Sequence, residues 1–497
     1  MPAPPRSGPP EGIPTAPPTG GRLASNPRAS WPWRLASTAL AGGLALGVAW
    51  CILHSPLTLY DGVGPILDAH RAESAWQMFV GGLHAPGYLR PLRLAQIKMV
   101  YDLSGGDPTA AFKAVHVGLV LALFAALLAL IRPSTPGECV AAGIAMMLPL
   151  GHHAFFMLYA EAYPINHVLE IAALALTTGA IARGRPGPLA DVAAILMAIV
   201  AVLTLESGLL VPVVTVSAWL LGWRGVSRWG AAAAVLVITG YLGVRFGVLH
   251  VTSPGLDERA AGWWLSRLEP EELIARFAHN RLPFYAYNVM ASIGDLLFSQ
   301  PRNGTFVMVR RWLDDAFNPW MAIQVTSSLL ATGIWLGACA QAARRWRTGS
   351  LDDRDRLVLL SLVLVLVNAV LGFGYVKSEM LSVGAAFYAA GVFAACASLL
   401  EGTRPRGRQM VVAALVAVLS VTWTTRAAGL FFSLRSSAYK TASDWGAYSL
   451  EREDPASWNI PAIRTLFEDI RRVNVGYGVP SPTVTNERRV HDYVEIQ

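Results

Sequence analysis

Long apolar runs separated by short polar turns dominate this chain between residues 33 and 432. A helix that crosses the ~30 Å hydrocarbon core of a bilayer needs about 20 mainly apolar residues. Runs of about this length cover 33–53, 111–131, 138–158, 164–182, 189–205, 207–223, 230–250, 320–343, 357–376, 380–400 and 410–432. We therefore predict an all-α polytopic membrane protein with about 11 transmembrane helices. The fifth and sixth runs meet at LTLESGLLVP and also allow a bent hairpin that does not fully cross.

Composition and charge support a membrane protein and argue against a nucleic-acid partner. Of the 497 residues, 54% are hydrophobic and 15% are charged, which is more apolar surface than a soluble fold of this length needs to bury. The net charge of +7 comes from short basic clusters between the apolar runs, which is how topology signals are distributed. The four cysteines all lie inside apolar runs without a CxxC pair, so neither disulfides nor cysteine metal ligands are predicted.

Arginines predict the orientation in the membrane. With the N-terminus in the cytoplasm, every short inner turn carries arginine, as the positive-inside rule requires. The arginines concerned are Arg22, Arg28, Arg34, Arg132, Arg183, Arg185, Arg224, Arg228, Arg344, Arg345, Arg347, Arg404, Arg406 and Arg408. We expect a multi-pass protein of a bacterial inner or plasma membrane, with the C-terminus outside.

This topology divides the chain into three parts. Residues 1–30 are rich in Pro, Gly and Ser and are expected to form a disordered cytoplasmic tail. Residues 31–432 form the transmembrane domain, whose long outer loops are 54–110 and 251–319. Within these loops, Pro91 and Pro270 are predicted to begin helices that lie along the outer membrane surface. Residues 433–497 form an outer C-terminal segment, with one amphipathic helix expected after Asn459.

Polar residues gather in the predicted outer half. All four lysines, Lys98, Lys113, Lys377 and Lys440, lie there, against the usual bias. Cations kept on that side favour a bound anion. The alternative is that each lysine extends to the lipid headgroups.

Several motifs give the outer half a family resemblance. Tyr88, Arg90, Pro91 and Leu92 form a Tyr-Arg-Pro-Leu motif with Leu89 inserted, and His116 begins the following span. These features resemble the GT-C superfamily of polyprenyl-phosphate-dependent glycosyltransferases, most closely its protein O-mannosyltransferase branch. Glu206 and Gly208 are similar to the family's Lys-Glu-x-Gly pattern, although Leu205 replaces the lysine, and Glu161-Ala162 partly matches a further loop motif. Asp61-Gly62 stands where the family often has two acids.

The resemblance implies a GT-C-like fold and an inverting glycosyltransferase, the enzyme class that we expect. Such an enzyme moves a sugar from a polyprenyl-phosphate donor to a hydroxyl of a protein or glycan acceptor on the outer face. Asp61, just beyond the first span, is the expected general base, because a carboxylate can take the acceptor proton as C1 is attacked.

The leaving phosphate needs cations, and the acceptor and sugar need polar contacts. The predicted phosphate-binding residues are Arg90, Arg93, Arg310 and Lys377, and the predicted substrate-binding residues are Asp68, His153, Glu161 and Glu206. Competing interpretations are that Arg90 is an interfacial anchor and that Arg310 and Lys377 pair with nearby acids.

Other assignments stay open at this point. No cofactor is predicted, and a divalent metal held by Asp61, Asp68, His70 or Glu73 is the weaker hypothesis. An O-antigen-ligase-like or polymerase-like enzyme would keep its critical residues in the 251–319 loop. A lipid-linked-sugar flippase or transporter would carry charges in mid-span, where this chain has few. The early position of Asp61 favours the glycosyltransferase.

Overall fold

The structure is a computed structural model that describes residues 27–55, 63–84, 88–105, 108–162, 165–250, 256, 265, 268–299, 304–402 and 405–452. These residues are helical, with no strand among them, which agrees with the predicted all-α class. The α-helices are α1 (Pro27–His54), α2 (Val63–Arg71), α3 (Ala75–Leu83), α4 (Pro91–Leu103), α5 (Pro108–Ile131), α6 (Pro136–Gly151), α7 (Phe156–Ala160), α8 (Asn166–Ala182), α9 (Pro188–Thr204), α10 (Leu210–Leu220), α11 (Arg228–Leu242), α12 (Pro270–Phe277), α13 (Leu282–Phe298), α14 (Gly304–Leu313), α15 (Pro319–Arg347), α16 (Asp353–Leu371), α17 (Ser382–Glu401) and α18 (Arg406–Arg452).

Four short helical turns complete the described elements. Three are 3₁₀ turns, η1 (His153–Phe155), η2 (Glu206–Leu209) and η5 (Ser378–Leu381), and the fourth, η3 (Gly243–Val248), is a π-helix. Each of the apolar runs predicted from the sequence falls on one or two of these elements, except the run at 138–158, which covers α6, η1 and α7. The run at 357–376 is an exception at its end, because α16 stops before Gly372 and the chain forms a loop there.

Among the described residues, six helices are long and apolar enough to cross a bilayer: Trp31–His54, Thr109–Ile131, Arg228–Val248, Pro319–Arg347, Ser378–Glu401 and Arg406–Arg435. A seventh span results if α6 and the η1–α7 turn, which are bent by 58°, are taken together. α8, α9 and the η2–α10 segment are apolar but shorter, and α16 has four charged residues in its first turn. The chain is therefore a multi-pass helical membrane protein, of which six spans meet the length and composition test.

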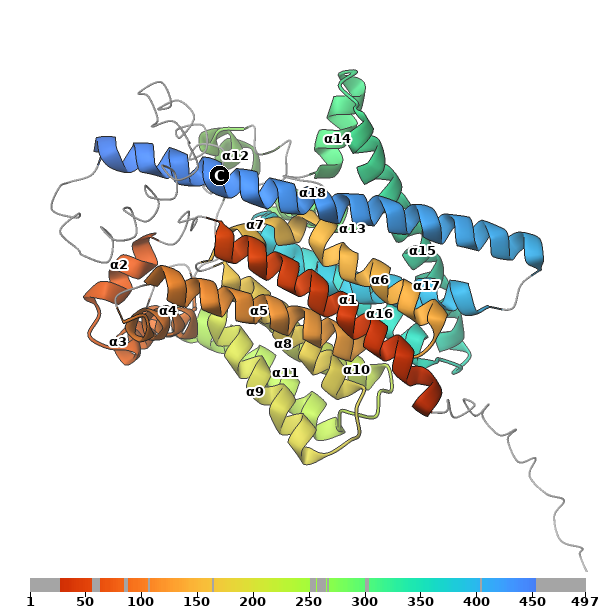
Figure 1. Ribbon diagram of the computed structural model, residues 1–497. Helices are drawn as coiled ribbons and strands as arrows, with labels where there is room; N and C mark the ends of the chain where they lie inside the picture. The colour runs from red at the N-terminus through yellow and green to blue at the C-terminus, as the bar shows by residue number, and fades with distance from the viewer. Residues whose placement is uncertain are drawn as a thin grey trace, which may run out of the picture.

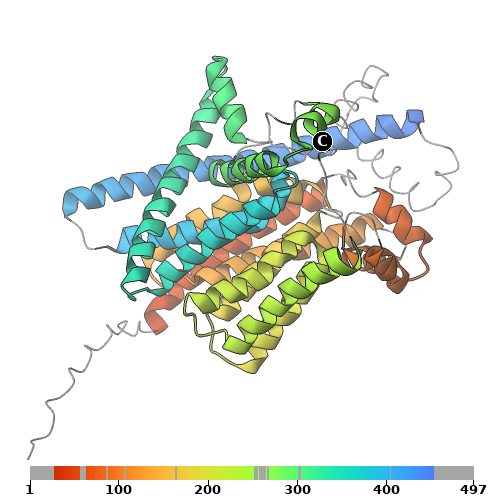
Figure 2. The ribbon, with the colours of Figure 1, turned by 180° about the vertical axis from the view of Figure 1, so that it is seen from behind.

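The helices pack side by side in a bundle with α17 at its centre (Figure 1). Every residue of α17 from Ser382 to Ala397 is buried, against α6, α8, α15 and α16. Alanine and glycine fill much of this helix, and small residues let neighbouring backbones approach closely in a membrane. Figure 2 shows α9, α10 and α11 on one side of the bundle, and α14 with the start of α15 standing away on the other.

One end of the bundle carries the arginine-rich turns, and its contacts hold those turns together. Arg354 bonds to both Glu138 and Glu401, which joins the ends of α16, α6 and α17. Arg183 donates to the carbonyl of Leu130, and Gly225 N–H donates to the carbonyl of Ala182. These contacts bring together helix ends next to several of the described turns whose arginines predict a cytoplasmic position. We call this the arginine end, and the other the pocket end.

Short helices form a layer at the pocket end. α2, α3 and α4 lie there, and α4 begins at Pro91 as predicted. α12 also begins at Pro270 as predicted. The structure adds a capping box between Glu269 and Glu272 at this start. The predicted domain boundary at residue 432 lies within α18, whose apolar part ends close to it, at Arg435, while the helix continues to Arg452. That helix meets no proline before Pro455, so nothing in the sequence stops it earlier.

Candidate functional site

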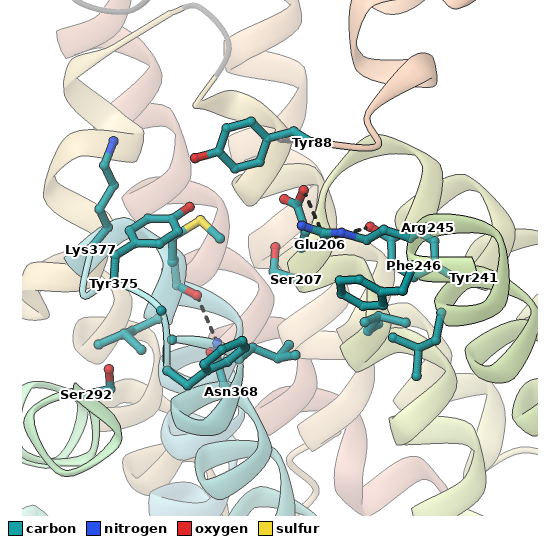
Figure 3. A pocket seen from close by; sticks show the side chains of 18 residues that line it. Tyr88, Glu206, Ser207, Tyr241, Arg245, Phe246, Ser292, Asn368, Tyr375 and Lys377 are labelled. Atoms are coloured by element: carbon teal, nitrogen blue, oxygen red, sulfur yellow. Dashed lines mark hydrogen bonds and ion pairs between the residues drawn. The ribbon is translucent and has the colours of Figure 1, made fainter. Parts of the chain in front are cut away.

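A pocket of about 140 Å³ lies at the pocket end, between the α10–α11 side of the bundle and the loop that follows α16 (Figure 3). Most of its lining is apolar or aromatic, with a few polar groups, which is typical of a small-molecule site. The lining residues are Tyr88, Glu206, Ser207, Leu209, Tyr241, Leu242, Arg245, Phe246, Ser292, Asn368, Leu371, Gly372, Phe373, Gly374, Tyr375, Lys377, Met380 and Leu381.

Glu206 is the carboxylate among the lining residues, and two arginines contact it. Arg90 approaches with both Nη2, at 2.6 Å, and Nε, at 2.8 Å, from the Oε2 atom. Arg245 lies farther away, with its Nη1 atom 3.4 Å from Oε1. The Glu206 and Arg90 side chains are each 15% exposed, so this is a largely desolvated ion pair.

Arg90 contacts Glu206 and does not line the pocket. Its guanidinium lies 4.0 Å from the ring centre of Tyr88 and hydrogen-bonds to Tyr375, and Arg90 is not a lining residue. Burial disfavours the charged guanidinium. The charge of Glu206 and its hydrogen bond outweigh that effect and hold the pKa of Arg90 above its ordinary value. Arg90 is thus a fixed partner of Glu206.

The local backbone brings Glu206 and Arg245 to the pocket. Leu205 is extended between α9 and η2, which turns the chain so that Glu206 points out of the apolar run. Gly208 makes this turn possible, since a Cβ there would lie 2.1 Å from the carbonyl oxygen of Ala201. Arg245 lies in the π-helix η3 and also donates to the Tyr241 hydroxyl at 3.2 Å. π-helical turns are frequent at functional sites.

The opposite wall is the loop from Gly372 to Lys377. Asn368 holds the start of the next helix with two hydrogen bonds, one to the Met380 carbonyl and one from Gly384 N–H. Asn288 of α13 donates to the carbonyl of Phe373 at 3.0 Å. Lys377 reaches the pocket from this loop and lies 3.8 Å from Glu379. Arg245 and Lys377 therefore provide cations on two facing walls.

A second polar cluster lies behind the pocket, between α4 and α8. Gln96 donates to both oxygens of Glu170, at 3.1 and 3.3 Å, and His167 lies 3.4 Å from the same carboxylate. Arg93 acts electrostatically on His167 and lies on the same helix as Gln96. Arg93 thus belongs to this cluster, and it is not a lining residue of the pocket.

The structure separates the predicted site residues into two groups. Glu206 and Lys377 line the pocket, and Arg90 supports it. His153 and Glu161 lie nearby, on either side of α7, where η1 contacts η5; Glu161 is buried and the His153 ring stacks on Phe156.

The other predicted residues lie elsewhere. Asp68 is exposed on α2, and Arg310 is exposed on α14, where it pairs with Asp314 at 2.8 Å. This pair matches the competing interpretation of Arg310. Asp61 lies outside the described residues. Asp68, His70 and Glu73 of the metal hypothesis are described, and no group of three or more acids, histidines or cysteines among the described residues could hold a metal ion.

Arg245 is the main lining residue that the sequence analysis did not select. The sequence does contain a signal for Arg245, because placing an ionisable side chain inside an apolar run costs free energy and therefore indicates a functional site. Ser207, Ser292, Tyr241 and Tyr375 had no comparable signal, since such residues are common in any helix or loop.

Comparison with known proteins adds no assignment. No protein-family model, curated protein or solved structure matches this chain. The evidence for a function therefore comes from the pocket.

Proposed function

We propose that the protein transfers a sugar from a polyprenyl-phosphate donor to an acceptor hydroxyl at the outer face of the membrane. One observation carries the proposal: a mainly apolar pocket at the bundle end has Arg245 and Lys377 on facing walls, together with the carboxylate Glu206. A lipid phosphate has the matching chemistry, with an anionic head and an apolar chain. The pocket end, opposite the arginine-rich turns, is the outer end under the positive-inside rule.

The two cations have different surroundings that suit a leaving phosphate. Arg245 is held by Tyr241 and by its longer contact with Glu206, and Lys377 lies beside Glu379. Fixed cations in a partly dry site stabilise developing negative charge far better than water does. In this proposal they act on the phosphate, whereas Arg90 holds Glu206.

The proposed reaction is a single displacement with inversion at C1 of the sugar. The acceptor oxygen bonds to C1 as the bond from C1 to the phosphate oxygen breaks. The acceptor proton goes to the Asp61 carboxylate, and the electron pair of the broken bond leaves with polyprenyl phosphate. Because the leaving group is a stable anion, it needs cations rather than a general acid.

Donor binding tests the anion site. Arg245→Ala should weaken binding of a polyprenyl-phosphate sugar to the purified protein at least ~10-fold, since a charge-assisted contact contributes about 1.5–3 kcal/mol. The control is Arg408→Ala, an exposed arginine at the arginine end. Equal affinity of the two variants, with both proteins folded, would remove the main support for this function.

A further inference from the structure

Two serine hydroxyls in the pocket have no hydrogen-bond partner among the described residues. Ser207 is 1% exposed and Ser292 is 0% exposed, and both line the pocket. Figure 3 shows Ser207 just below Glu206 and Ser292 on the far side, below Tyr375 and Lys377. The two hydroxyls therefore belong to different parts of the pocket wall.

The two serines differ from another polar residue of the lining. The Asn368 carboxamide, which also lines the pocket, uses both its nitrogen and its oxygen in hydrogen bonds. A buried hydroxyl without a partner is destabilising, so buried polar groups normally find one. The two serines are therefore positioned to bond to something that enters the pocket.

The charges restrict what that group can be. Glu206 is the only acid among the lining residues, and both of its oxygens already face arginines. The Oε1 atom has no hydrogen bond among the described residues, but the charge of the nearby Arg245 disfavours a second cationic group there, such as a protonated amine. Ser207 and Ser292 are neutral groups that both donate and accept, which suits sugar hydroxyls.

We infer that the pocket holds the sugar ring of the donor, that Ser207 and Ser292 bond to its hydroxyls, and that this sugar carries no positive charge. This inference rests on the proposed function. A site built to hydrogen-bond a hydroxyl strongly rejects analogues without it, because its own polar groups are then left unpaired. The two serines are thus specificity-determining residues.

The test measures binding of three probes to purified full-length protein in detergent. The probes are a polyprenyl phosphate without sugar, the same lipid carrying a neutral hexose, and the same lipid carrying an amino sugar. Ser207→Ala and Ser292→Ala should each weaken hexose-lipid binding about 5–10-fold, the effect of one hydrogen bond, and leave binding of the sugar-free lipid unchanged. The wild type should bind the hexose lipid more tightly than the amino-sugar lipid.

Ser382→Ala is the matched control. Ser382 is also fully buried with an unpartnered hydroxyl among the described residues, but it does not line the pocket. This variant should bind all three probes as the wild type does. A similar loss in Ser382→Ala would show that the effect is structural and would overturn the inference.

The outcomes separate this inference from the proposed function. If Arg245→Ala weakens binding of the sugar-free lipid but neither serine variant changes the preference for the hexose lipid, the inference fails and the anion site stands. Equal losses for the two lipids in the serine variants would show that these hydroxyls hold only water, which also overturns it. If the wild type binds none of the three lipids, both proposals fail.

Discussion

At the residue scale, the charges around the pocket are divided between holding the structure and facing the ligand. Arg90 and Glu206, 116 positions apart, meet through two short contacts, while Arg245 makes one longer contact to the same carboxylate. Removing one partner of a buried pair leaves a desolvated charge behind. Arg90 should therefore matter for stability and Arg245 for binding.

This division predicts different stabilities for two arginine variants. Arg90→Ala should lower the free energy of unfolding by about 3 kcal/mol, since it leaves Glu206 largely buried without its closest partner. Arg245→Ala should cost much less, because Arg90 still pairs with Glu206. Thermal unfolding of the two purified variants in detergent measures the difference. Equal stability of the two variants would contradict this division of roles.

Asp61 is the predicted general base, so its substitution should act on rate rather than on folding. Asp61→Asn keeps the shape of the side chain but removes its basicity, and sugar transfer should fall at least ~10²-fold. Asp68→Asn is the matched control, because Asp68 is exposed on α2. Transfer by both variants is measured with a polyprenyl-phosphate donor. A wild-type rate for Asp61→Asn would move the search for the base to Glu161 and Glu206.

At the element scale, the C-terminus of α13 shows how the interior holds a helix end. The last carbonyls of a helix have no partner within it. Here four side chains from three other segments bond to them: His152 to Leu296, Thr332 to Leu297, Ser328 to Phe298 and Arg426 to Ser299. α13 can therefore end in a buried position beside the pocket.

Arg426 is the central member of this set. It also donates to the carbonyl of Gly151, so it holds the C-terminal ends of both α6 and α13. Arg426→Met should lower the free energy of unfolding by about 2–4 kcal/mol, because at least two buried carbonyls lose a charged donor. Chemical unfolding monitored by circular dichroism measures the change, with Arg408→Met as the exposed control. A wild-type midpoint for Arg426→Met would show that these carbonyls find other donors.

The turn from α9 to η2 depends on one glycine. Gly208→Ala should abolish folding or greatly reduce the yield, because the added Cβ would overlap the backbone of Ala201. Gly118→Ala on α5 is the control, since nothing lies within 4 Å of its Cβ position. Size-exclusion elution of both variants measures the effect. A monodisperse Gly208→Ala protein would mean that the turn has room to shift.

At the scale of the whole molecule, the two ends of the bundle differ in charge and in structure. The arginine end is joined by ion pairs such as those of Arg354, whereas the pocket end carries short helices and the pocket. In the proposed orientation, which follows the positive-inside rule, the arginine end faces the cytoplasm and the proposed donor and acceptor meet at the outer surface.

Labelling of cysteines tests this orientation. A cysteine at Gly349, in the turn at the arginine end, should not react with an impermeant thiol reagent in intact cells. A cysteine at Ser481 should react, because the C-terminus is predicted to be outside. The native cysteines are free but three are buried and Cys139 is half-buried, so the unmodified chain gives the background. Labelling at position 349 would reverse every sidedness assignment.

The sequence by itself determined the helical elements and much of their arrangement along the chain. Apolar runs of about 20 residues specify helices in a membrane, because backbone groups there must bond within their own segment. Pro91 and Pro270 marked the starts of α4 and α12, since proline fits the first turn of a helix better than any later turn. These signals are local, so they can be read from the sequence without knowledge of the fold. The arginines of the short turns likewise predicted which helix ends lie at the same end of the bundle.

Only the tertiary structure decided which polar residues share a site. Arg90 and Glu206 were both selected, but nothing in their spacing shows that they pair or that Arg245 joins them. Arg310 was selected for its charge, yet α14 holds it away from the pocket. Ser207 and Ser292 come from segments 85 positions apart. Helix packing buries both hydroxyls, and neither has a hydrogen-bond partner among the described residues. These contacts between distant side chains depend on long-range helix packing, and no local sequence pattern encodes them.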